Sequence, residues 1–98
     1  LIAVFLDTKS LDDKFPSNYL KHSQSIGAAI QNMLLAAHEL GLGTCWIGEI
    51  LKNEDKVREL LDVSDELQLM AVISVGYSSR INLKSKRKDI SENIVSWP

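Results

Sequence analysis

Residues 25–48 read SIGAAIQNMLLAAHELGLGTCWIG, and this stretch decides the fold. Apolar side chains recur in it every three or four residues, which is the spacing of one face of an α-helix. The residues of this stripe are Ile26, Ile30, Met33, Ala37 and Leu40. A helix is therefore predicted from Ser23 or Ser25 to about Leu40.

A second apolar set widens the stripe until little of the helix surface is polar, namely Ala29, Leu34, Leu35 and Ala36. Such a helix is expected to be buried, either in a core or against another subunit. Gly27, Ala28 and Ala29 would let another backbone approach its N-terminal part closely. Gly41 and Gly43 are expected to stop it, because glycine adopts the left-handed cap conformation without steric cost.

Apolar runs on both sides of this helix predict strands. Leu1–Leu6 is continuous and short, as in a central strand buried on both faces. Leu67–Val75 is a second apolar run, which Gly76 and Tyr77 terminate. The polar segment 7–18, with loop formers such as Asp12, Asp13 and Pro16, is expected to be a connection.

Between the helix and the second strand we expect a short apolar connection over 44–50 and then a second helix. Asn53 would cap this helix, and Glu54 and Asp55 suit the positive end of its dipole. The order strand, helix, helix, strand and tail predicts a mixed α/β or α+β fold, without internal repeats. We treat residues 1–98 as one domain.

Composition narrows the class of protein. The chain has 98 residues, 45% hydrophobic and 24% charged, as in a small globular domain that gains stability from a partner. No apolar run approaches the roughly 20 residues of a membrane span, and a net charge of -2 argues against a general nucleic-acid binder. The single cysteine favours a cytoplasmic setting. Because the chain starts inside a strand and without methionine, we infer that upstream sequence is missing.

Several residues that could carry chemistry have simpler interpretations. Cys45 with His22 or His38 could suggest a thiol nucleophile and its base, but a buried structural cysteine is the simpler interpretation. Cysteine, histidine and carboxylate residues at the spacing of metal ligands are absent. The pair Gly41 and Gly43 follows a helix rather than a strand, which excludes a dinucleotide-binding fingerprint. Taken alone, Trp46 would be a core residue.

The tail after Tyr77 is basic first and apolar last. Its basic residues are Arg80, Lys84, Lys86, Arg87 and Lys88. Such a cluster is usually a solvated loop and less often an anion site. Its apolar end, Ile94, Val95 and Trp97, is expected to dock on its own domain or on a second subunit.

The helix-and-loop stretch, the strand Met70–Tyr77 and the basic cluster followed by Ile90–Trp97 together resemble the FMN-dependent nitroreductase family. The resemblance implies a three-layer fold, of which this chain would be the C-terminal half, and a homodimer with FMN at the interface. It further implies that NAD(P)H passes a hydride to the flavin, which then reduces a nitro compound, quinone or similar small acceptor. The cofactor carries that chemistry, so no catalytic acid-base pair is expected.

The same resemblance implies roles for individual residues. Trp46, Ile47, Gly48 and Glu49 match the loop beside the isoalloxazine ring, where a small Gly48 would let a backbone N–H approach the flavin N5 edge. The phosphate pair matches Lys86 and Lys88, or Arg87 if one residue is inserted. The arginine-rich phosphate motif of the family would lie upstream of Leu1, and Ser78 replaces its usual proline.

Two hypotheses remain open on the sequence alone. One is a redox enzyme chain that forms an FMN site with a partner chain or an upstream half. The other is a non-catalytic dimerising or binding domain that holds no flavin. A flavin-using relative that dehalogenates or fragments the flavin is an enzymatic alternative to the first. Stoichiometric FMN binding separates the two hypotheses.

Overall fold

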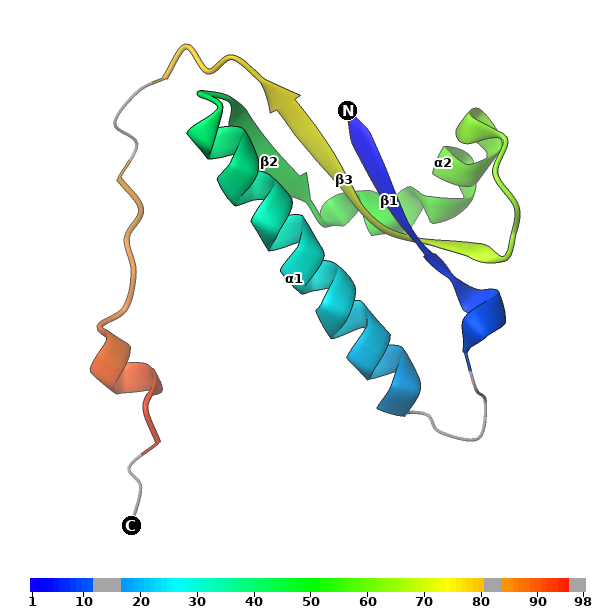
Figure 1. Ribbon diagram of the computed structural model, residues 1–98, viewed down its shortest axis with the longest axis horizontal. Helices are drawn as coiled ribbons and strands as arrows, with labels where there is room; N and C mark the ends of the chain where they lie inside the picture. Colours follow the sequence, from blue (N-terminus) through cyan, green and yellow to red (C-terminus); the bar gives the residue numbers. More distant parts are fainter. Residues whose placement is uncertain (12–16, 81–83, 96–98) are drawn as a thin grey trace.

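The computed structural model describes residues 1–11, 17–80 and 84–95. A three-stranded antiparallel sheet carries helix α1 on one face and helix α2 on the other, so the elements form three layers (Figure 1). The elements in chain order are β1 (Ile2–Asp7), the 3-10 turn η1 (Thr8–Ser10), α1 (Ser17–Glu39), β2 (Gly43–Ile47), the 3-10 turn η2 (Glu49–Asn53), α2 (Glu54–Leu61), β3 (Leu67–Gly76) and the 3-10 turn η3 (Ile90–Asn93). The predicted mixed α and β class is confirmed.

The strand order in the sheet is β1-β3-β2, so β3 is the central strand. Ile73 of β3 lies opposite Ile2 on one side and opposite Trp46 on the other. The prediction of β1 as a central strand was wrong, since β1 occupies an edge. The predicted apolar connection over 44–50 was also wrong, because most of it is strand β2. Five residues are too few to show strand periodicity in a sequence, whereas pairing with β3 defines them at once.

Helix α1 begins at Ser17, earlier than the predicted Ser23 or Ser25, and ends with a Schellman motif. The N–H of Gly41 donates to His38 O at 2.9 Å and that of Leu42 donates to Ala37 O at 2.8 Å. Gly41 has φ +75°, so it supplies the stop as predicted. Gly43 does not; it is the first residue of β2.

Only one face of α1 packs on the sheet. Ile30 is 1% exposed and contacts Ala71 and Ile73 of β3. On another face of the same helix Leu35 is 58% exposed, and Leu40, directly after the helix end, is 75% exposed. The expectation of a helix buried all round is therefore wrong for the single chain, because a sheet covers only one side of a helix. Burial against another subunit stays a prediction.

Helix α2 lies against the opposite face of the sheet, where Val57 and Leu61 line an apolar pocket with Ala3 and Val72, while Leu60 is 84% exposed. Asn53 is at the N-cap position, but its side chain makes no cap hydrogen bond, in contrast to the prediction. The C-terminal end repeats the Schellman geometry of α1. Asp62 takes the glycine position there, with φ 51°.

The tail leaves the end of β3 and runs apart from the sheet (Figure 1). The radius of gyration is 16.8 Å, against roughly 13 Å for a compact chain of about this length. Ile94 and Val95 are exposed, so within the chain they do not dock as one expectation had it. Trp97 lies outside the described residues, as do Asp12, Asp13 and Pro16.

Candidate functional site

The end of strand β2 presents the residues that the sequence assigned to the flavin ring. Trp46 and Ile47 are the last residues of β2, Gly48 follows, and Glu49 opens η2. Trp46 is 41% exposed, so it is not the core residue that its type alone suggested. Because β2 is an edge strand, this corner lies at the rim of the sheet.

The indole of Trp46 reaches back over the first half of α1. A Cβ placed on Gly27 would lie 3.7 Å from Cη2 of Trp46, which is ordinary van der Waals contact. The neighbour that approaches Gly27 is thus an aromatic side chain, where the sequence had suggested a backbone. The contact places the ring of Trp46 at the junction between helix and sheet.

Open space surrounds Gly48. A Cβ placed there would meet nothing within 4 Å, and its φ of -80° does not require glycine. The backbone at this position is therefore accessible to a ligand. The adjacent Glu49 pairs with Lys52 within η2, and both side chains are largely exposed.

The other end of β2 borders a shallow cavity of about 340 Å³ between β2 and the end of β3. Gly43 is tightly placed there, since an added Cβ would lie 3.1 Å from Ser78 Cβ. Cys45 also lines this cavity and is exposed. The interpretation of Cys45 as a buried structural cysteine was wrong, because its strand has no neighbour on the outer side in the part of the chain that the structure describes.

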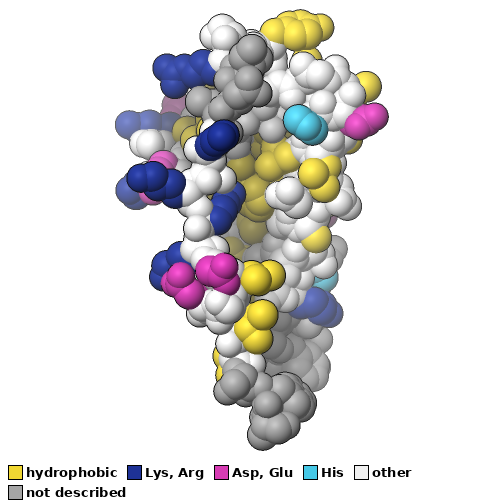
Figure 2. Space-filling model, turned by 90° about the vertical axis from the view of Figure 1, so that its left-hand side faces the viewer, with side chains coloured by type: hydrophobic (Ala, Val, Ile, Leu, Met, Phe, Trp, Pro, Cys, Tyr) yellow, Lys and Arg dark blue, Asp and Glu magenta, His cyan; other side chains and the backbone are white. Residues whose placement is uncertain are grey.

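The predicted phosphate residues lie on the tail. Lys86, Arg87 and Lys88 are exposed in a segment without regular structure before η3. Figure 2 shows Lys and Arg side chains along one edge of this view, beside a hollow that is floored by hydrophobic side chains. In Figure 1 this part of the tail lies apart from η2. Within one chain, the structure does not bring the two halves of the predicted site together.

The turn η3 follows directly after the basic segment and Asp89. The carboxylate of Asp89 accepts hydrogen bonds from the side chain and the backbone N–H of Ser91, the latter at 2.9 Å. These bonds lower the pKa of Asp89 below its ordinary value. Asp89 is therefore a negative charge directly after Lys88.

The two candidate bases for Cys45 lie far from each other. His22 and His38 stand on α1 at a separation of roughly 24 Å, at 1.5 Å per helical residue. No group of three potential metal ligands is found among the described residues. No described helix is long and apolar enough to cross a membrane.

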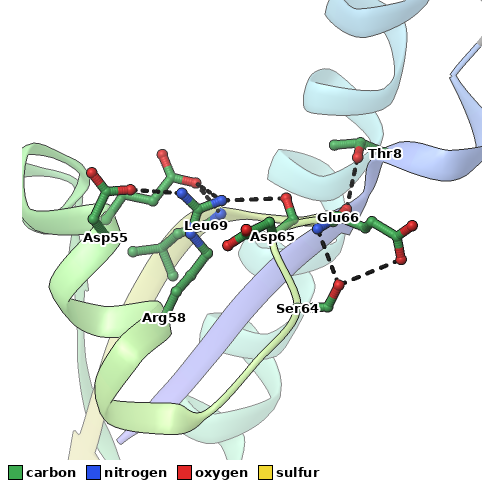
Figure 3. Close-up of polar contacts among 8 residues, drawn as sticks. Thr8, Asp55, Arg58, Ser64, Asp65, Glu66 and Leu69 are labelled. Carbon is green, nitrogen blue, oxygen red and sulfur yellow. Dashed lines mark hydrogen bonds and ion pairs between the residues drawn. The ribbon is translucent and has the colours of Figure 1, made fainter.

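Sequence reasoning missed one polar cluster, which joins α2 to the start of β3 (Figure 3). Arg58 donates to Asp55 Oδ1 at 2.6 Å and to Asp65 O at 3.4 Å, and its Nη1 is 3.7 Å from Glu54 Oε1. The bond to Asp55 is the main cause that raises the pKa of Arg58. The acidic first turn of α2 was the available signal, and it had been assigned to the helix dipole alone.

Known proteins are similar to this chain in sequence and in fold. The model of the Nitroreductase family matches residues 2–77. An FMN reductase (NADPH) of Bacillus subtilis is 39% identical over 59 residues, which are 60% of this chain and 24% of that protein. A protein of Methanothermobacter thermautotrophicus, provisionally named NADH dehydrogenase/NAD(P)H nitroreductase, is 35% identical over 79 residues. These are 78% of this chain and 39% of that protein.

One solved structure resembles the chain closely in three dimensions. It is described as a nitroreductase, provisionally so named, in complex with FMN, from Desulfovibrio desulfuricans. Its TM-score is 0.82 at 35% identity, and the likeness covers 98% of this chain and 53% of that chain. The chain thus spans about half the length of this neighbour and less of the two relatives.

Proposed function

The chain belongs to the nitroreductase family, and from this premise we propose that it forms part of an FMN-dependent oxidoreductase. In this proposal NAD(P)H is the electron donor, and a nitro-aromatic compound, a quinone or a similar small molecule is the acceptor. The observation that carries it is the likeness over 98% of the chain to a structure that contains FMN. The name of the B. subtilis relative, FMN reductase (NADPH), supports the same donor.

The residues present fit one side of a flavin site. The exposed indole of Trp46 offers a flat apolar surface, and the open space at Gly48 leaves backbone N–H groups accessible. The exposed cations Lys86, Arg87 and Lys88 suit a phosphate, since a doubly charged anion is stabilised by several positive charges. Bound FMN would supply the electron transfer between donor and acceptor.

Each group has a separate task in this proposal. Trp46 and Ile47 would exclude water from one edge of the ring, and the backbone at Gly48 and Glu49 would donate hydrogen bonds to it. Lys86, Arg87 and Lys88 would hold the phosphate. Because the single chain keeps these groups apart, we propose that another part of the complete protein or a second copy completes the site.

We propose a homodimer for the same reason. Met33 and Leu35 on α1 and Leu40 directly after it keep exposed apolar surface, which a second subunit would bury. We also propose that residues 1–98 are one domain corresponding to about half of the complete fold, as the 53% coverage of the neighbour supports. A cytoplasmic setting stays a prediction from the single cysteine.

The test is a visible absorption spectrum of the complete protein after FMN has been added and the excess removed, followed by NADH and NADPH oxidation assays. We expect retained flavin bands. Joint replacement of Lys86, Arg87 and Lys88 by alanine should weaken FMN binding. The matched control replaces the exposed residues Lys9, Lys21 and Lys56, which removes the same charge away from the candidate site. A colourless wild-type protein, or equal loss in both triple variants, would contradict the proposal.

The exposed apolar side of α1 favours a second candidate, a dimerising domain that holds no flavin. Burial of Leu35 and Leu40 between two copies needs no cofactor. Light scattering after gel filtration measures the mass of the species. A stable dimer that retains no FMN would select this candidate over the enzyme.

A further inference from the structure

Strand β3 extends beyond its partner β2, and past the end of β2 a side chain accepts a backbone hydrogen bond from β3. The β2 pairing covers residues 72–76 of β3. Three residues further back, the backbone N–H of Leu69 donates to Glu54 Oε1 at 3.0 Å. Leu69 is only 2% exposed, so water is a poor substitute for this acceptor. A buried N–H without an acceptor is costly, which gives the Glu54 bond structural weight.

The place of this bond coincides with an irregularity in the sheet. Val4 pairs with Ala71 and Phe5 pairs with Leu69, so Met70 is an extra residue on β3. Such a bulge disturbs the regular ladder locally. The carboxylate of Glu54 therefore holds the central strand at the position where its pairing is least regular.

Glu54 is itself held in place by Arg58, one helical turn later on α2. The two side chains are only 25% and 21% exposed, and their charged atoms lie 3.7 Å apart. Arg58 also donates to the carbonyl of Asp65 in the turn that leads into β3 (Figure 3). These contacts restrict the rotamers of the Glu54 carboxylate.

The connection with the candidate site is direct along the chain. Residues 48–53 lie between two attachments to the same strand: the pair of Ile47 with Val72, and the bond from Leu69 to Glu54. Inside this segment the N–H of Leu51 donates to Gly48 O at 3.1 Å. The N–H of Glu54 in turn donates to Leu51 O, which links Gly48 to Glu54 through two successive bonds.

We propose that Glu54 is a positioning residue, whose carboxylate fixes the backbone of Gly48 and Glu49 relative to the central strand and thereby to the flavin. This inference rests on the proposed function for its ligand. Glu54 does not touch the cofactor in it. Its effect passes through the η2 turn, because loss of the Leu69 bond removes the hydrogen bond that ties the C-terminal end of this turn to β3.

The test compares Glu54→Ala and Glu54→Gln with the control Glu59→Ala, which changes an exposed glutamate on the same helix. Amide hydrogen exchange is measured at Leu69 and at residues 48–51. The dissociation constant for FMN and the absorption band of bound FMN are measured on the same proteins. Glutamine keeps an oxygen acceptor for Leu69 but loses the charge that faces Arg58.

We expect Glu54→Ala to accelerate exchange at Leu69 and at 48–51 about tenfold, to weaken FMN binding about tenfold and to shift the flavin band, as loss of one hydrogen bond to a charged group implies. Glu54→Gln should recover most of each change, and Glu59→Ala should behave as wild type. If Glu54→Ala unfolds, the comparison of Glu54→Gln with Glu59→Gln decides, with a smaller change of the same sign expected only in the first.

The outcomes separate this inference from the proposed function. If wild type and Glu54→Ala bind FMN equally with the same spectrum, the positioning role is refuted and the oxidoreductase proposal stands. If the complete wild-type protein binds no FMN, the proposed function fails, and unchanged exchange at 48–51 in Glu54→Ala overturns the anchoring role as well. Faster exchange confined to Leu69, with 48–51 unchanged, also contradicts the inference.

Discussion

Replacement of Ile30 by alanine tests how far the packing of α1 on the sheet depends on its most buried side chain. Ile30 is 1% exposed and packs on Ala71 and Ile73. Loss of the carbons beyond Cβ removes about 2.4 kcal/mol of transfer free energy at ~0.8 kcal/mol per methylene. The cavity left behind adds to this, so we expect a loss of about 3 kcal/mol in the free energy of unfolding.

The assay is urea unfolding followed by circular dichroism, with all proteins at one concentration, since a dimer would make stability depend on concentration. Leu60→Ala is the control, because it truncates a helical side chain that is 84% exposed. We expect it to cost less than about 0.5 kcal/mol. If Ile30→Ala leaves too little folded protein, Ile30→Val should still cost about 1 kcal/mol. Equal stabilities for Ile30→Ala and Leu60→Ala would refute the described packing of α1.

Three further predictions follow from local geometry. The two Schellman motifs predict opposite effects on stability, because both glycine positions have positive φ. Gly41→Ala should lower the free energy of unfolding by about 1 kcal/mol, and Asp62→Gly should raise it by about 0.5 kcal/mol. Unfolding temperatures that change equally in both variants would contradict this. Cys45 is exposed, so a thiol reagent should label it in the native protein at a rate similar to that in urea, and strong native protection would show that it is covered. Ser91→Ala should raise the pKa of Asp89 toward its ordinary value in an NMR titration, because it removes one of the two Ser91 hydrogen bonds that lower it. Since that pKa is depressed, the Asp89 contribution to η3 is present above the ordinary carboxyl pKa and is lost as the pH falls through the lowered value.

The elements with strong local signals were predicted well. The stripe from Ile26 to Leu40 defined the body of α1, and Gly41 marked its end through a conformation that glycine adopts easily. The run 67–75 was apolar enough to be identified as a strand by content alone, within one residue of its observed end, although its central position was not predicted. The resemblance carried by residues 25–48 gave the family, since that stretch joins the helix, the stop and the loop in one pattern.

Only the tertiary structure decided which of these elements pair and pack against one another. Strand β2 was invisible because five residues form a strand only when β3 pairs with them. The burial of α1 was overestimated, because periodicity shows which side chains are apolar but not how many neighbours exist to cover them. The acceptor that Glu54 provides for Leu69 joins positions 15 residues apart, and no local preference predicts such a bond. The sequence by itself determined the helices, the residues that end them and the family, because these depend on short-range preferences. Contacts between residues distant in the chain determined which strands lie at the edges of the sheet, which side chains are exposed and which side chains hold the sheet in place.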